Sequence, residues 1–156
     1  MIGVRVQAQA IDIAVEAGIL TAGREDIGAV VSFVGHVRAD DGLIALTLEH
    51  YPAMTQQQLS AIAAVAAARW PLLGGVVVHR HGRMVPGEAI VLVAIASAHR
   101  AAAFEAAAFL MDWLKTRAPF WKVEERAGGR QWVAAKPSDD AAAQRWDIIS
   151  ETATPR

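Results

Sequence analysis

Cysteine is absent from the 156 residues of the chain. Disulfide bonds, thiolate metal sites and a cysteine nucleophile are therefore excluded, and the chain cannot carry sulfur as a persulfide of its own. Any sulfur chemistry performed by this protein has to use sulfur that a partner holds.

Long apolar runs are also missing. The most apolar stretch, residues 89–98, is ended by His99 and Arg100, well short of the roughly 18 residues that a membrane-spanning helix needs. Asp12 and Glu16 interrupt the N-terminal segment where an export signal would carry an unbroken apolar core. These two absences predict a cytoplasmic protein.

Two catalytic motifs are lacking as well, the Gly-x-Ser-x-Gly elbow of hydrolases and a glycine-rich phosphate loop. His79 and His81 lie two residues apart and would share a strand face, which suits a pair of metal ligands, but the spacing of the sequence offers no third ligand. We therefore expect no bound metal and no cofactor.

What the chain does contain is a folded composition with a local excess of positive charge. Hydrophobic residues make up 54% and charged residues 20%, and the length predicts a single domain over residues 1–156. The formal net charge of −1 argues against nonspecific binding to nucleic acid. Residues 99–136, however, hold seven Lys and Arg against four acids, including all three lysines of the chain, Lys115, Lys122 and Lys136. This block predicts a local site for an anion such as a phosphorylated small molecule.

The pattern of β-branched residues, prolines and glycines predicts an α+β fold in which helices pack on a mixed sheet. The element order is β-α-β-β-α-β-β-α-β-β. Strands are expected at 28–38, 43–50, 76–81 and 88–97, a turn-rich connection at 82–87, a hairpin of 120–126 with 130–135, and helices at 12–18, 55–70 (capped by Thr55), 97 or 99 to 117 and 139–147.

The long helix carries two cations at the ends of an apolar stripe, Arg100, Phe104, Ala108, Met111 and Lys115. We expect Lys115 to be partly desolvated, and a lysine in such a place can act as a nucleophile or base or pair with an anion. The alternative is a lysine that suits the helix dipole in the last turn and extends its ammonium group to solvent.

Two further cationic segments are candidates for an anion site. Ser97, His99 and Arg100 lie at a strand-to-helix junction, where free backbone N–H groups favour an anion; alternatively, Ser97 is an N-cap and the other two are solvated. Arg38 ends an apolar strand, where it can serve such a site or form an ion pair with Asp40 or Asp41.

The final hairpin combines aromatic residues with a cation. Trp121 and Lys122 must point to opposite faces of their strand, so one faces the core and the other a site or an interface. Alternatively, Lys122 is only an exposed charge that prevents the edge of the sheet from pairing with another strand. We predict a homodimer formed partly by the long helix or this hairpin, because their aromatic residues exceed the needs of one core: Phe109, Trp113, Trp121 and Trp132.

Several short motifs, in their order and spacing, resemble the large, catalytic subunit of molybdopterin synthase over about residues 28–147. They are Phe33-Val-Gly-His-Val-Arg38, Leu46-Thr-Leu-Glu-His-Tyr-Pro52 with Met54-Thr55, Arg69-Trp-Pro-Leu72, His79-Arg80, Gly82, Ser97-Ala-His-Arg100 and Met111-Asp-Trp-Leu-Lys-Thr-Arg-Ala-Pro-Phe-Trp-Lys122. The first 25 or so residues match this pattern poorly, Ala53 stands where Gly is common, and His36 stands where a lysine can occur.

The resemblance implies a mixed α/β hammerhead-type fold with added antiparallel strands and an enzyme of molybdenum cofactor biosynthesis. Such an enzyme converts cyclic pyranopterin monophosphate into molybdopterin with sulfur from the C-terminal glycine thiocarboxylate of a small ubiquitin-like subunit. It implies a homodimer within a heterotetramer. The family's catalytic lysines correspond to Lys115 and Lys122, and its residues for the anionic pterin to Arg38, His99, Arg100 and Lys136.

Two other functions fit the same residues. One is a noncatalytic module that binds a ubiquitin-like tail through an exposed strand and a basic groove. The other is a histidine-dependent cyclic phosphoesterase that would use His99 beside Arg100.

Overall fold

The computed structural model describes residues 1–134 and 137–152. Its elements follow the predicted order of strands and helices, with one additional short strand between the strands expected at 76–81 and 88–97. In chain order they are β1 (Ile2–Gln7), α1 (Ile13–Thr21), β2 (Ala29–His36), β3 (Ala45–His50), α2 (Pro52–Arg69), β4 (Leu72–Arg80), β5 (Gly82–Met84), β6 (Ala89–Ser97), α3 (Arg100–Thr116), β7 (Phe120–Arg126), β8 (Gly129–Val133) and α4 (Pro137–Thr152).

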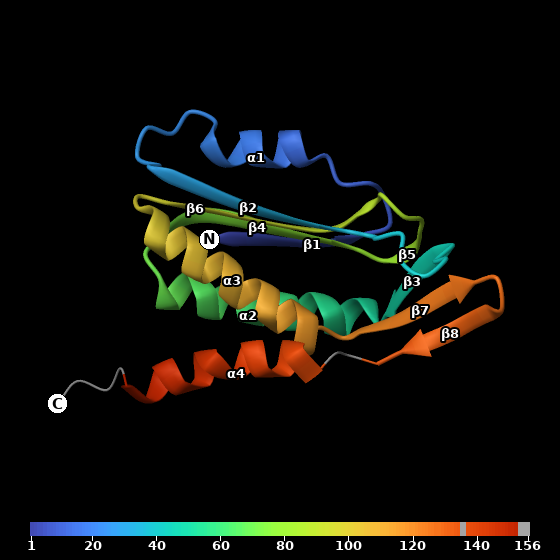
Figure 1. Ribbon diagram of the computed structural model, residues 1–156. Coiled ribbons are helices and arrows are strands. Elements are labelled where there is room, and N and C mark those ends of the chain that lie inside the picture. Colours follow the sequence, from blue (N-terminus) through green and yellow to red (C-terminus); the bar gives the residue numbers. More distant parts are fainter. Residues whose placement is uncertain (135–136, 153–156) are drawn as a thin grey trace.

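The strands form two sheets. The larger sheet has the order β1-β4-β6-β2, in which β1 is parallel to β4 and the other pairs are antiparallel. The smaller sheet, with the order β5-β3-β7-β8, is antiparallel and lies beyond one end of the larger sheet (Figure 1). The expected α+β class, with helices on a mixed sheet, is confirmed.

Helices cover both faces of the larger sheet. Figure 1 shows α1 on one face, α2 and α3 on the other, and α4 outside α3. The main core lies between the sheet and the two long helices, where α3 turns Ala103, Ala106 and Leu110 inward. The small alanine side chains let the helix approach the sheet closely. Leu110 is 1% exposed, so Leu110→Ala would leave a cavity in this core and should lower the free energy of unfolding by about 2–5 kcal/mol.

Local chemistry explains where the elements differ from the sequence-based expectations. The second helix begins at Pro52 after the N-cap Tyr51, so Thr55 is not its cap; proline suits the first position of a helix because it has no N–H to satisfy. The fourth strand begins at Leu72 and not at residue 76, because the glycines before residue 76 are part of the strand. Gly75 packs closely on the neighbouring strand, where a Cβ would lie 2.8 Å from Ile95 Cδ1. The connection expected over residues 82–87 contains the short strand β5.

No helix within the described parts of the chain is long and apolar enough to cross a membrane.

Candidate functional site

The two candidate catalytic lysines flank the connection from α3 to β7. Lys115 lies in the last turn of α3, and Lys122 is the third residue of β7, opposite Leu48 on the neighbouring strand. Lys122 is half-buried, whereas Lys115 is exposed. The expected desolvation of Lys115 is therefore wrong: Leu114, about 100° away around the helix, occupies the buried side of that turn.

The stripe that ends in Lys115 is a surface feature. Arg100 and Phe104 are exposed, and Ala108 and Met111 are half-buried. The side of α3 that packs on the sheet carries the buried alanines instead. Phe104, 59% exposed, is therefore an apolar side chain with no core to enter within one chain.

Arg38 lies at the same end of the molecule as Lys115. The backbone N–H of Val37 donates to the carbonyl of Glu88, so Arg38 lies next to the start of β6. The helix α3 follows β6 and runs back along the sheet, so its C-terminal end, with Lys115, also lies near the start of β6. Arg38 Nη2 donates to Asp40 Oδ2 over 2.8 Å, and this hydrogen bond raises the pKa of Arg38. The ion-pair alternative for Arg38 is thus confirmed, although its side chain is 76% exposed and can still reach a ligand.

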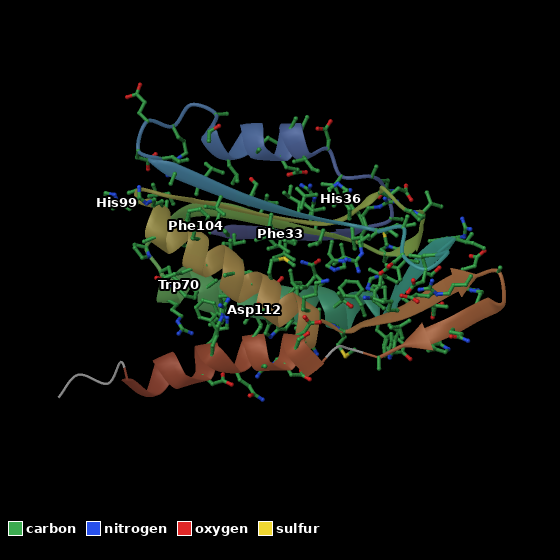
Figure 2. The ribbon with its side chains drawn as sticks, viewed as in Figure 1. Phe33, His36, Trp70, His99, Phe104 and Asp112 are labelled. Carbon is green, nitrogen blue, oxygen red and sulfur yellow. The ribbon has the colours of Figure 1, made fainter. Side chains whose placement is uncertain are left out.

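His99 and Arg100 lie at the opposite end. Ser97, the residue before Ala98 in this junction, pairs with Ala29 at the start of β2, whereas the other end of β2 pairs with the start of β6. Figure 2 places His99 and His36 at opposite ends of the sheet. Since α3 rises about 1.5 Å per residue, Arg100 and Lys115 are about 22 Å apart along the helix. The structure therefore does not bring the two groups of candidate residues together within one chain.

The strand-to-helix junction presents these two cations to solvent. His99 is the N-cap residue but makes no capping bond, and the Ser97 hydroxyl, which is buried, donates to the His99 carbonyl. Ser97 is therefore not the N-cap. Among the described residues, the side chains of His99 and Arg100 form no ion pair and no hydrogen bond. Gly28 lets β2 approach this turn, because a Cβ there would collide with the Ala98 carbonyl oxygen.

Lys136, the last of the candidate residues for binding the pterin, lies outside the described residues.

A group of histidines that the sequence suggested only as a metal pair lies beside Lys115. His79 is buried and stacks on Phe120 with ring centroids 4.0 Å apart. The His50 ring lies 5.5 Å from Phe120 and 4.5 Å from His81. Within the described portion of the chain, no three His, Asp or Glu side chains are arranged to hold a metal ion.

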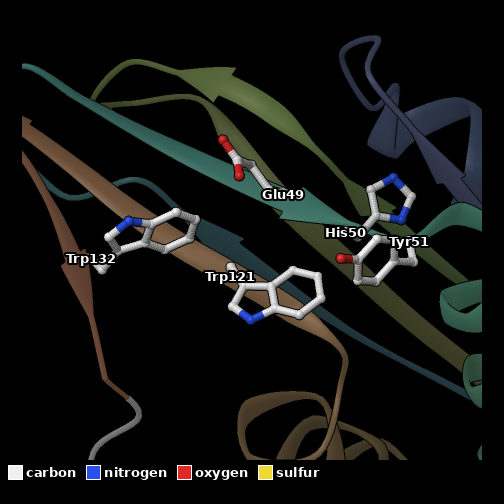
Figure 3. A pocket seen from close by; sticks show the side chains of 5 residues that line it. All are labelled: Glu49, His50, Tyr51, Trp121 and Trp132. Atoms are coloured by element: carbon white, nitrogen blue, oxygen red, sulfur yellow. The ribbon is translucent and has the colours of Figure 1, made fainter.

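An open pocket of about 390 Å³ lies at the ends of β3 and β7 (Figure 3). Its lining residues are Glu49, His50, Tyr51, Trp121 and Trp132. Glu49 is directly opposite Trp121 across the strand pair, so both point to the face of the sheet that Lys122 does not share. The expected division of β7 into two chemically different faces is confirmed.

The aromatic residues expected at an interface divide into two groups. Trp121 and Trp132 are 41% and 64% exposed. Phe109 is buried, and packs with Trp70 and Trp146 at ring separations of 5.2 and 5.6 Å. The expectation that Phe109 contributes to an outer surface is wrong, because α4 covers that side of α3.

Comparison with known proteins decides the family. The sequence model described as "MoaE protein" matches residues 6–117, which is 112 of the 156 residues. The chain belongs to the MoaE family. The match begins at residue 6, so the expectation that the first 25 residues fit the family poorly is wrong.

MoaE relatives resemble the chain over nearly its full length. The molybdopterin synthase catalytic subunit of Mesorhizobium japonicum is 58% identical over 151 residues, covering 95% of each chain. The structure of the molybdopterin biosynthesis MoaE protein from Burkholderia ambifaria has 46% identity and a TM-score of 0.81, covering 94% of this chain and 99% of that one.

A more distant MoaE-like fold occurs in the complex of subunits 1 and 2 of the molybdopterin-converting factor from Helicobacter pylori. Its matching chain has 23% identity and a TM-score of 0.68, and the match covers 85% of this chain and 89% of that one. This likeness shows the shared fold.

Sequence reasoning missed the packing around Phe120. Its only signal was the spacing of His79 and His81, since His50 and Phe120 come from other strands and approach them only in the folded chain.

Proposed function

We propose that the chain is the catalytic subunit of a molybdopterin synthase. It converts cyclic pyranopterin monophosphate into molybdopterin, and a small ubiquitin-like subunit supplies the sulfur from a C-terminal thiocarboxylate. The observation that carries the proposal is the placement of Lys115, Lys122 and Arg38 at one end of a chain whose relatives bear this name over nearly their whole length. The lack of cysteine fits an enzyme whose sulfur arrives on a partner.

Each candidate residue has a role that its chemistry suits. Lys115, exposed at the end of α3, acts beside the thiocarboxylate carbon, and Lys122 contacts the anionic substrate. The substrate phosphate is held by cations that form charge-assisted hydrogen bonds: Arg38, His99, Arg100 and Lys136.

These roles require two copies of the chain. β2 is an edge strand of the larger sheet, and its exposed Phe33 lies near the exposed Phe104 (Figure 2). If two β2 edges meet about a twofold axis, their antiparallel pairing brings the start of one strand to the end of the other. His99 and Arg100 of one copy then approach Arg38 and Lys115 of the second copy, and the proposed homodimer has two complete sites.

The dimer surface is tested by Phe33→Asp, which puts a charge in the middle of the proposed β2 interface. Sedimentation at micromolar concentration should give a dimer for the wild type and a monomer for the variant. Trp132→Ala removes an exposed aromatic residue from the other sheet and should remain dimeric. A dimeric Phe33→Asp protein contradicts this interface.

The reaction is tested by incubating the protein with cyclic pyranopterin monophosphate and a thiocarboxylated small subunit. The dithiolene product should form only when both are present. Failure to form product with a donor that is active in another molybdopterin synthase contradicts the proposal.

The phosphoesterase alternative has little support, since His99 has no carboxylate to orient its ring among the described residues.

The noncatalytic binding module differs from the enzyme in one measurable way: Lys115 and Lys122 would then affect affinity and not turnover. The cytoplasmic location stays a prediction.

A further inference from the structure

Four rings form a continuous column where the two sheets meet. In spatial order they are His81, His50, Phe120 and His79, with successive centroid separations of 4.5, 5.5 and 4.0 Å. The rings of His79 and Phe120 are nearly parallel, 16° apart. His79 belongs to the larger sheet, whereas His50 and Phe120 face each other across a strand pair of the smaller one. The column therefore joins the two sheets.

Hydrogen bonds fix the orientation of two of the imidazoles, one through a backbone carbonyl and one through a threonine hydroxyl. His79 Nδ1 donates to the Arg80 carbonyl over 2.8 Å. The hydroxyl group of Thr55, which is fully buried, donates its proton to the Tyr51 carbonyl. The hydroxyl oxygen of Thr55 therefore accepts a hydrogen bond from His50 Nδ1 over 3.0 Å. Both rings thus have a single orientation and a proton on Nδ1.

The rings next to Phe120 are neutral at neutral pH. The pKa of His79 is lowered to about 4, mainly by burial. The hydrogen bond to the Arg80 carbonyl opposes this shift, and the positive charge of Lys115, which lies within electrostatic reach of the ring, is a smaller cause of the lowering. Burial also lowers the pKa of His50, with a smaller contribution from His81. Neutral rings pack against Phe120 without placing a buried positive charge near the ammonium group of Lys115.

The column touches the chain between the two candidate catalytic lysines. Lys115 lies in the last turn of the helix that packs on the larger sheet, and only residues 116–119 separate it from Phe120. Lys122 is two residues beyond Phe120, on a strand of the smaller sheet. The spacing of the two lysines therefore depends on how Phe120 is held against His79.

We propose that His79 is a positioning residue for sulfur transfer: by stacking on Phe120 it locks the junction of α3 and β7 and sets Lys115 and Lys122 at their working distance. This inference rests on the proposed function, because it assigns those lysines to the reaction. His79 itself does not touch the substrate in this account. What it contributes is a flat, neutral, buried ring.

The first experiment measures the junction without using activity. Amide hydrogen exchange is followed in His79→Ala and His79→Phe, with Trp132→Ala as a control that removes a ring outside the column. In His79→Ala, exchange of residues 116–124 should quicken by at least about tenfold, while residues 100–108 at the other end of α3 keep the wild-type rate. His79→Phe, which retains a flat ring, should stay within about threefold of the wild type.

The second experiment separates positioning from general stability by steady-state kinetics. His79→Ala should lower kcat by about tenfold or more and leave the KM values for pterin and small subunit nearly unchanged. His79→Phe should recover kcat to within a few-fold, although it cannot donate to the Arg80 carbonyl.

The outcomes are distinct. If His79→Ala leaves exchange at residues 116–124 unchanged, or if His79→Phe behaves like His79→Ala in both experiments, the stacking role is wrong. If His79→Ala quickens exchange across the whole chain, His79 is only a core residue and the inference also fails. If the exchange pattern is as expected but the wild type makes no molybdopterin with a competent donor, the proposed function is what fails.

Discussion

The two ends of α3 carry their cations in different surroundings. At the start of the helix, His99 and Arg100 are exposed on a tight turn, without side-chain hydrogen-bond or ion-pair partners in the described residues. At the far end, Lys115 lies near His79, which stacks on Phe120, and Lys122 is half-buried on the strand that begins with Phe120. At one end the side chains are packed around the proposed catalytic lysines, and at the other the cations face solvent. This difference supports the proposal that His99 and Arg100 serve a site which their own chain does not complete.

The largest expected effect is at the end that carries Lys115. Lys115→Ala should reduce product formation by at least about a hundredfold, because the proposed role of this lysine is at the reacting carbon. The fold and the affinity for the small subunit should persist, since the side chain is exposed and its loss opens no cavity. Single-turnover assays with saturating donor and substrate measure the loss, and turnover within a few-fold of the wild type would return Lys115 to a solvated lysine in the last helical turn.

Lys122→Ala should have a smaller effect, about tenfold in kcat/KM, because the remaining cations of the site still hold part of the substrate anion. Arg130→Ala, an exposed cation on the neighbouring strand β8, is the matched control and should change kcat/KM by less than twofold. Equal losses in the two variants would show that the effect comes from general positive charge and not from Lys122.

The sequence predicts the helices and strands well where their boundaries depend on local residues, and less well where they depend on distant contacts. Most element boundaries follow from β-branched runs, prolines and glycines, and the strand from Phe120 to Arg126 is placed as predicted. The start of α2 at Pro52 follows from a local preference of proline, whereas the expectation from the sequence takes Pro52 only as the end of a strand. The packing of Gly75 against Ile95 depends on a neighbour in three dimensions, so the inclusion of Gly75 in β4 could not be predicted.

The candidate site shows the same limit. Motif order identifies Lys115, Lys122, Arg38, His99 and Arg100, but a motif carries no distance, and a helix of 17 residues separates the cations of its two ends. The helical period correctly places Phe104 and Met111 on one side of α3 with both end cations. It does not reveal that this side is left exposed by the sheet and that the alanines face inward.

A smaller effect is the loss of folding stability in acid that comes from His79. The folded-state pKa of His79 is about 4, against an ordinary value of 6.5, so the unfolded chain takes up a proton first as the pH falls. Stability should therefore be lost between pH 6.5 and 4, by up to about 3 kcal/mol from this group.

Urea unfolding at pH 7 and at pH 4.5 measures this loss. His79→Phe has no group to protonate at that position and should lose less stability than the wild type over the same interval. Equal losses in the two proteins would mean that His79 is not buried as a neutral ring.

The most direct test of the account is whether the two ends of α3 from different copies form one site. Lys115→Ala and the double variant His99→Ala/Arg100→Ala are co-expressed with different tags, and the mixed dimer is purified by both tags and assayed at low pterin concentration. One of its two sites then has wild-type residues at both ends, so activity should recover to about half that of the wild type, although each parent dimer is nearly inactive. A mixed dimer no more active than the average of its two parents would contradict the shared site and place His99 and Arg100 outside it.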